Sequence, residues 1–152
     1  MTDRGKPVVI LMAEDDPDDR LLSQEALEEA HLTNTLSFVK DGEELMDYLL
    51  QRGPYAAPAK APRPGVILLD LNMPRKDGRE ALAEIKTDPD LRVIPVVVLT
   101  TSHAEEDILR SYNLGVSGYI TKPVRLEELI NVMRTLGKYW FEIVELPPTE
   151  RL

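Results

Sequence analysis

The sequence predicts an α/β fold in which a five-stranded parallel sheet carries helices on both faces, within a single domain. Three observations support this prediction. Five short apolar runs alternate along the chain with segments of helical periodicity. Each run is uniformly apolar rather than alternating, which is typical of strands buried on both faces. The length of 152 residues suits one domain that can bury its own core.

The first half of the chain contains two predicted strand–helix units, with strands at 8–13 and 36–39. A helix is expected after Asp16, because an N-cap carboxylate is followed by Pro17 at the first helical position. A second helix is expected after Asp41, which forms a capping box with Glu44. Residues 53–65 contain four prolines and are predicted to form a loop.

Three more units follow, with strands predicted at 66–70, 96–99 and 118–121. Asp77 and Gly78 precede the third helix. Ser102 and Glu105 form a further capping box, which opens the fourth helix. The last helix has a long apolar face that consists of Leu126, Leu129, Ile130, Met133, Leu136 and Trp140.

The composition excludes several classes of protein. The net charge of −9 disfavours binding to nucleic acid or to an anionic membrane surface. Without cysteine, the chain has no disulfides, thiolate nucleophiles or Cys-ligated metals. The N-terminus resembles no signal peptide, and no apolar run is long enough to span a membrane. We therefore expect a cytoplasmic protein.

Polar side chains follow the predicted strands at the edge where ligands bind in such sheets. The first strand ends in Glu14 and Asp15, the third in Asp70, the fourth in Thr100 and the fifth in Lys122. Clustered carboxylates repel each other unless a cation lies among them, and their oxygens suit Mg²⁺ or Mn²⁺. A hydroxyl and an ammonium suit phosphoryl oxygens. Together these groups predict phosphoryl transfer, with an aspartate as the nucleophile.

The order of these residues resembles the receiver domains of two-component response regulators. The resemblance spans about residues 7–138. It rests on Glu14-Asp15, Asp70, Met73-Pro74-x-x-Asp77-Gly78, Thr100, Tyr119 and Lys122-Pro123. It implies a flavodoxin-like fold with strand order 2-1-3-4-5 and five helices.

The resemblance also implies a role for each site residue. Asp70 would accept a phosphoryl group from a sensor histidine kinase. Asp15 and Asp70 would hold Mg²⁺, with Glu14 acting mainly through water and the Asn72 backbone carbonyl as a further ligand. Lys122 would pair with Asp70 and the phosphoryl oxygens.

Other positions would control the response to phosphorylation. Thr100 would turn inward to bond the phosphoryl group, and Tyr119 would change rotamer with it. Asn72 and Ser102 would tune the lifetime of the phosphorylated state. The neighbouring carboxylates Asp16, Asp18 and Asp19 are instead interpreted as a solvated helix start that favours the helix dipole.

The predicted organisation is an N-terminal tail at 1–6, a receiver domain at 7–138 and an aromatic extension at 139–152. That extension is too short for a DNA-binding or enzymatic output domain. The chain should therefore act through an unknown downstream protein that recognises its surface, or by draining phosphoryl groups from the kinase. The extension begins with Tyr139, Trp140 and Phe141, an apolar group that we expect to form a homodimer contact.

A narrower resemblance links the chain to single-domain regulators paired with bacterial and cyanobacterial phytochromes. Its partner would then be a light-sensing histidine kinase. The features concerned are Glu14-Asp15-Asp16, loop 53–65, Thr100-Thr101-Ser102, Ser111-Tyr112, Tyr119-Ile120-Thr121-Lys122-Pro123 and Tyr139-Trp140-Phe141.

Two other classes of function remain as alternatives. A metal-dependent phosphatase with an aspartyl nucleophile generally has an acid two residues later, where this chain has Asn72. A binding scaffold related to flavodoxins would need a phosphate-binding loop after the first strand, where this chain has acidic residues. A receiver that had lost phosphorylation should lack Asp70 or Lys122, and both are present.

Overall fold

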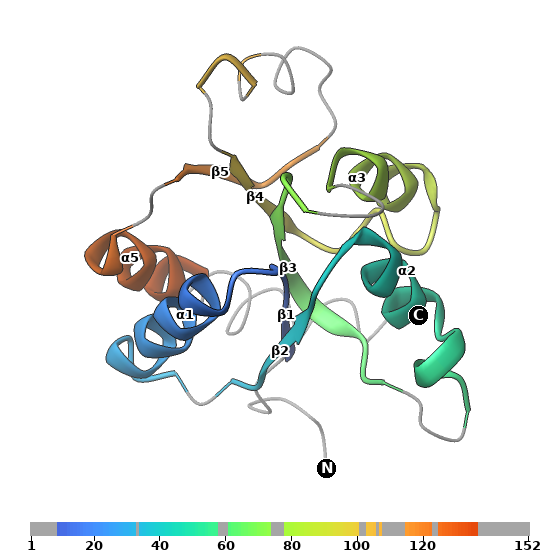
Figure 1. Ribbon diagram of the computed structural model, residues 1–152, viewed down its shortest axis with the longest axis horizontal. Helices are drawn as coiled ribbons and strands as arrows, with labels where there is room; N and C mark the ends of the chain where they lie inside the picture. The colour runs from blue at the N-terminus through green and yellow to red at the C-terminus, as the bar shows by residue number, and fades with distance from the viewer. Residues whose placement is uncertain are drawn as a thin grey trace.

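The chain folds into a parallel sheet covered by helices (Figure 1). The computed structural model describes residues 9–32, 34–57, 61–73, 78–100, 103–105, 107, 115–122 and 125–136. Within these ranges the strands are β1 Val9–Ala13, β2 Leu36–Val39, β3 Pro64–Asp70, β4 Val96–Thr100 and β5 Gly118–Thr121. The helices are α1 Pro17–Glu29, α2 Gly42–Leu50, the short 3₁₀ helix η1 Gly53–Tyr55, α3 Gly78–Thr87 and α5 Leu126–Leu136.

The strand order is β2-β1-β3-β4-β5, with parallel pairing between all neighbours. This confirms the predicted order. The pairing register aligns the carboxyl ends of four strands. Ala13 pairs with Leu69, so Glu14 follows next to Asp70. Thr100 pairs with Thr121, so Lys122 follows next to the end of β4.

Helices cover both faces of the sheet, with α1 and α5 on one side and α2 and α3 on the other (Figure 1). Alternate residues of each strand join different cores. Leu11 and Ile67 pack with the α2 and α3 side, whereas Ile10 and Val66 pack with the α1 and α5 side. Because both faces are covered, the three central strands β1, β3 and β4 are buried over nearly their whole length, whereas the edge strands β2 and β5 are only partly buried.

The first two helices begin where their caps were predicted. The Asp16 carboxylate accepts a hydrogen bond from the Asp18 amide at 2.8 Å. The Asp41 carboxylate accepts one from the Glu44 amide at 2.7 Å. The Glu44 carboxylate reaches back to the Lys40 amide at 2.8 Å. This second bond lies one residue before the usual position in a capping box.

The prediction that residues 53–65 form a loop without a regular element was wrong at both ends. Gly53–Tyr55 forms η1, with Pro54 in its first turn, where the fixed φ of proline favours a helical start. Pro64 and Gly65 belong to β3. Proline is tolerated there because Pro64 is the first residue of the strand.

Several predictions concern residues outside the described ranges. These are the tail at 1–6, Pro74, Asp77, Thr101, Ser102, Ser111, Tyr112, Pro123 and the extension at 139–152 with Tyr139, Trp140 and Phe141. Of the predicted fourth helix, residues 103–105 and 107 are described and helical. Among the residues that the structure describes, no helix is long and apolar enough to cross a lipid bilayer.

The contact between η1 and α2 predicts a loss of stability at high pH. Burial, together with a hydrogen bond of 2.7 Å from the Tyr55 hydroxyl to Glu44, raises the pKa of Tyr55 from 10.0 to about 12. Between these two pH values the folded chain keeps a proton that the unfolded chain releases, so the free energy of unfolding falls as pH rises. In urea unfolding experiments between pH 9 and 12, the free energy of unfolding should decrease less steeply with pH for Tyr55→Phe than for the wild type. Equal slopes would contradict this explanation.

Candidate functional site

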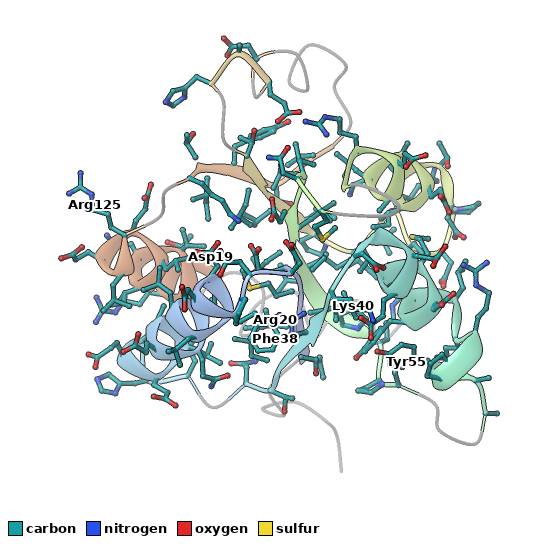
Figure 2. The ribbon with its side chains drawn as sticks, in the orientation of Figure 1. Asp19, Arg20, Phe38, Lys40, Tyr55 and Arg125 are labelled. Atoms are coloured by element: carbon teal, nitrogen blue, oxygen red, sulfur yellow. The ribbon has the colours of Figure 1, made fainter. Side chains whose placement is uncertain are left out.

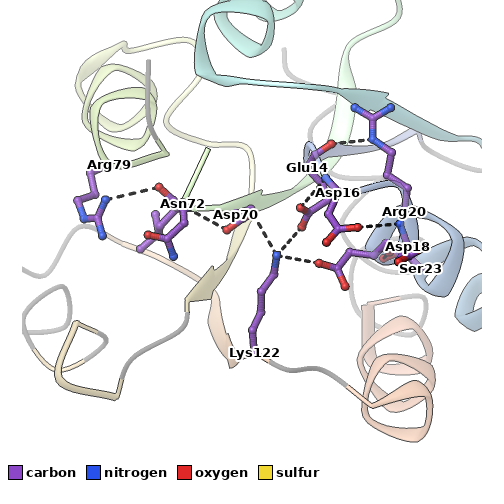
Figure 3. Close-up of polar contacts among 11 residues, drawn as sticks. Glu14, Asp16, Asp18, Arg20, Ser23, Asp70, Asn72, Arg79 and Lys122 are labelled. Carbon is purple, nitrogen blue, oxygen red and sulfur yellow. Dashed lines mark hydrogen bonds and ion pairs between the residues drawn. The ribbon is translucent and has the colours of Figure 1, made fainter. Parts of the chain in front are cut away.

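An acidic cluster occupies the carboxyl edge of the sheet, where β1 and β3 end side by side (Figure 3). One carboxylate oxygen from each of Glu14, Asp15 and Asp70 lies within 4.8 Å of the others. Glu14 and Asp70 are buried, with 0% and 2% exposure, whereas Asp15 is exposed. The strand ends thus bring together the three carboxylates that the sequence predicted as metal ligands.

Lys122 projects into this cluster from the end of β5. Its Nζ lies 2.8 Å from Glu14 Oε1 and 3.0 Å from Asp70 Oδ2. A third contact of 3.0 Å reaches Asp19 Oδ2. An ammonium has three donors, and each has an acceptor here. One cation therefore joins carboxylates from β3, α1 and the segment between β1 and α1.

The charges in the cluster determine the protonation of Lys122. Burial alone would lower the pKa of Lys122. The hydrogen bond with Glu14, the charge of Asp70 and the hydrogen bond with Asp19 together outweigh burial and raise it. The ammonium therefore stays charged at neutral pH, as a group that pairs with phosphoryl oxygens must.

The pKa of Glu14 is raised as well, but for a carboxyl group a raised pKa disfavours the charged form. Burial, with a smaller contribution from the charge of Asp70, outweighs the hydrogen bond from Lys122 and raises the pKa of Glu14 to about 7. Its Oε2 also accepts a hydrogen bond from the Asp16 amide at 3.1 Å. Even with the ammonium in place, the cluster carries more negative charge than one cation balances, which favours binding of a further cation.

The donor set fits a small divalent cation. Carboxylate oxygens at a partly open site are hard ligands that suit Mg²⁺ or Mn²⁺, which keep several waters. Asp70 Oδ1 accepts a hydrogen bond of 3.0 Å from the Asn72 amide, which orients the carboxylate. Glu14, Asp15 and Asp70 are the residues that could hold the ion, and the Asn72 backbone lies next to them.

Arg20 fixes the turn that presents Glu14 and Asp15. Its Nε donates a hydrogen bond of 2.6 Å to the Glu14 carbonyl. Its guanidinium lies 5.2 Å from the centre of the Phe38 ring in β2 (Figure 2). This combination of a hydrogen bond and a cation–π contact holds the first turn of α1 against the sheet.

Gly78 sets the approach of α3 to the end of β3. A Cβ atom at this position would lie 2.4 Å from the Asp70 carbonyl oxygen and 2.5 Å from Leu71 Cα. The Gly78 amide also donates a hydrogen bond of 3.1 Å to the Leu71 carbonyl. Glycine is therefore required for α3 to begin directly against the backbone of Asp70.

The predicted switch residues lie beside the cluster, on β4 and β5. Thr100 is fully buried, and its hydroxyl donates a hydrogen bond of 2.7 Å to Glu105 Oε1. Glu105 in turn forms an ion pair with Arg79 of α3. Tyr119 is half-buried and packs against the core on the side of α2 and α3.

Three charged residues near the site make contacts that were not predicted from the sequence. Asp19 was interpreted only as part of a helix start, yet it is also a partner of Lys122. Glu105 was predicted only as a capping residue, and Arg79 was not singled out. All three lie within one turn of a helix start near the carboxyl edge of the sheet. A charged side chain at such a position can reach the strand ends, and this is the sequence feature that could have indicated them.

Comparisons with known proteins identify the family. The family described as "Response regulator receiver domain" matches residues 10–134 of this chain. The chain therefore belongs to the response regulator receiver domain family, as its strand-end residues predicted. It is 47% identical over 148 residues to the response regulator Rcp1 of Synechocystis sp., covering 97% of this chain and 99% of that protein.

Two solved structures resemble the chain in both fold and sequence. The phosphorylated cyanobacterial phytochrome response regulator RcpA is 48% identical, with a TM-score of 0.74 over 88% of this chain and 94% of that one. The Mn²⁺-bound form of Rcp1 is also 48% identical, with a TM-score of 0.76 over 93% and 99%. Together they support the flavodoxin-like fold and a site for a divalent metal.

Proposed function

We propose that this chain accepts a phosphoryl group from a sensor histidine kinase onto Asp70, in the presence of Mg²⁺ or Mn²⁺. One observation supports this above all. The buried Asp70 carboxylate lies beside two further carboxylates and 3.0 Å from the Lys122 ammonium, at the carboxyl edge of the sheet. These are the groups that an aspartyl phosphate requires: a nucleophile, ligands for a cation and a fixed positive charge.

The transfer reaction assigns a task to each group. An Asp70 carboxylate oxygen attacks the phosphorus of a phosphohistidine, the new O–P bond forms, and the P–N bond breaks. The imidazole leaves with the bonding electron pair and takes up a proton. Lys122, already adjacent to Asp70 Oδ2, pairs with the phosphoryl oxygens as negative charge accumulates, and the Thr100 hydroxyl donates to one of them.

The metal ion would be held by Asp15 and Asp70, with Glu14 acting mainly through water and the Asn72 backbone carbonyl as a further ligand. When bound, it neutralises charge on the carboxylates and on the phosphoryl oxygens. The protein contributes the placement of these ligands, because β1 and β3 are neighbours in register. Thr100 and Tyr119 then form the switch, while Asn72 and Ser102 tune dephosphorylation.

The partner that we propose is a phytochrome-type light sensor with histidine kinase activity. Its support is the identity of 48% to the phytochrome response regulator RcpA over most of both chains. The chain turns over no external substrate in this proposal and signals through a downstream protein. The receiver boundaries at 7–138, the homodimer contact at Tyr139, Trp140 and Phe141, and the cytoplasmic location stay predictions.

Phosphotransfer from a labelled kinase tests the proposal. A phytochrome histidine kinase carrying ³²P on its histidine should lose label to this chain within minutes when Mg²⁺ is present. The acquired label should be stable in acid and labile in base, as an acyl phosphate is, and EDTA should prevent the transfer. Label that remains on the kinase would contradict the proposed partner. Steady hydrolysis of small phosphate esters would favour a phosphatase instead.

A further inference from the structure

The hydroxyl of Thr100 is already engaged in the structure. It donates to Glu105 Oε1 at 2.7 Å, and Thr100 itself has no exposed surface. A hydroxyl carries a single hydrogen, so it donates to one acceptor at a time. A bond to a carboxylate is also stronger than a bond to a neutral acceptor. Thr100 must therefore release Glu105 before it can donate to a phosphoryl oxygen on Asp70.

Glu105 is itself held by a second contact. Its other carboxylate oxygen forms an ion pair with Arg79, and the Glu105 side chain is only 16% exposed. Arg79 also donates from Nη1 to the Leu71 carbonyl at 3.5 Å (Figure 3). Leu71 directly follows Asp70. A continuous set of contacts therefore connects the backbone next to Asp70, through α3, to the hydroxyl at the end of β4.

We propose that Glu105, held in place by Arg79, is a positioning residue that keeps the Thr100 hydroxyl in its resting arrangement and thereby opposes the phosphorylated state. This inference rests on the proposed function of Asp70 and Thr100. The ion pair with Arg79 allows the Thr100 hydroxyl to exchange Glu105 for a phosphoryl oxygen as its acceptor. When Thr100 turns to the phosphoryl group, the Glu105 carboxylate keeps its ion pair with Arg79 and is not left as an uncompensated buried charge.

The competition has a measurable consequence for a phosphoryl analogue. Fluoroberyllate with Mg²⁺ mimics a phosphoryl group on an aspartate, so its binding requires Thr100 to exchange acceptors. Removal of the competing acceptor in Glu105→Ala should tighten fluoroberyllate binding about ten- to a hundredfold, the range for one hydrogen bond to a charged group. Glu105→Gln keeps an acceptor oxygen without the charge and should give an intermediate affinity.

A double-mutant cycle tests whether the effect passes through Thr100. The Kd for fluoroberyllate is measured for the wild type, Glu105→Ala, Thr100→Ala and the double variant. In the Thr100→Ala background, Glu105→Ala should change the Kd less than twofold. The control is Glu25→Ala, which removes the same charge from an exposed position on α1 and should leave the Kd unchanged.

The NMR signal of the Thr100 methyl group gives a second measurement of the arrangement of this side chain. A general loss of protein stability would not produce the same change in this signal. Without fluoroberyllate, the ¹³C–¹H signal of this methyl group in Glu105→Ala should move toward the position that it has in the saturated wild type. Equal affinities for the wild type and Glu105→Ala, or an equal gain in the Thr100→Ala background, would overturn this inference alone. A wild type that binds no fluoroberyllate, with Asp70→Asn indistinguishable from it, would overturn the proposed function as well.

Discussion

Asp70→Asn should abolish the Mg²⁺-dependent gain of one phosphoryl group when the chain is incubated with acetyl phosphate and weighed intact by mass spectrometry. The amide has nearly the shape of the carboxylate but is not a nucleophile toward phosphorus. The fold should survive, because the loss of the Asp70 charge relieves its repulsion of Glu14 while Lys122 keeps its ion pairs with Glu14 and Asp19. The expected loss of phosphorylation is therefore complete, with no accompanying loss of stability.

A matched control separates this result from a general effect of charge. Asp18 is an exposed carboxylate in the first turn of α1, close in sequence to the cluster but not one of its three members. Asp18→Asn should gain the phosphoryl group as the wild type does. A gain that persists in Asp70→Asn would place the nucleophile elsewhere, and a gain without Mg²⁺ would remove the metal from the proposal.

Gly78→Ala should give the largest loss of stability among single-methyl additions at the described glycines. Its Cβ would lie 2.4 Å from the Asp70 carbonyl oxygen and 2.5 Å from Leu71 Cα. Both are backbone atoms, one in the last residue of the central strand β3 and one in the residue after it, so α3 must move away as a unit. Overpacking of this kind costs about 3 kcal/mol, at the upper end of the usual range. Urea unfolding should show this loss, and acetyl phosphate should label the variant more slowly.

Gly118→Ala is the comparison for this experiment. Gly118 begins β5, and among the residues that the structure describes a Cβ there would meet only the Val97 methyl groups, at 3.9 Å, an ordinary van der Waals distance. We expect its free energy of unfolding to stay within about 1 kcal/mol of the wild type, as for a strand residue without a steric conflict. Similar losses in both variants would show that α3 accommodates the methyl group and that Gly78 is not required for its position.

The sequence identified the residues of the site that lie at strand ends. Asp70, Thr100 and Lys122 were predictable because parallel strands end at one edge, and a polar residue after an apolar run marks that edge. The partners that come from helices were not. Whether Asp19, Arg79 or Glu105 reaches the edge depends on how each helix rotates and on where it starts, which hydrophobic periodicity gives only to within a few residues.

The same limit applies to segments that lack periodicity. Pro64 was assigned to a loop because it belongs to a segment with four prolines, yet as the first residue of β3 it is compatible with the strand. The 3₁₀ turn at Gly53–Tyr55 is too short to have a repeating pattern. Its position depends on the Tyr55 contact with Glu44, which no local signal reveals.

The long-range contacts of Lys122 determine when, during folding, the proposed phosphorylation site becomes complete. Its ammonium joins residues that are 108, 103 and 52 positions away in sequence, all through the last strand of the sheet. Closing such long loops is entropically costly and comes late in assembly. A chain whose last strand has not docked would hold the proposed acceptor Asp70 without the Lys122 ammonium beside it. Partly folded molecules should therefore not accept a phosphoryl group. In the proposed function, a kinase would then transfer phosphoryl groups only to fully folded regulators.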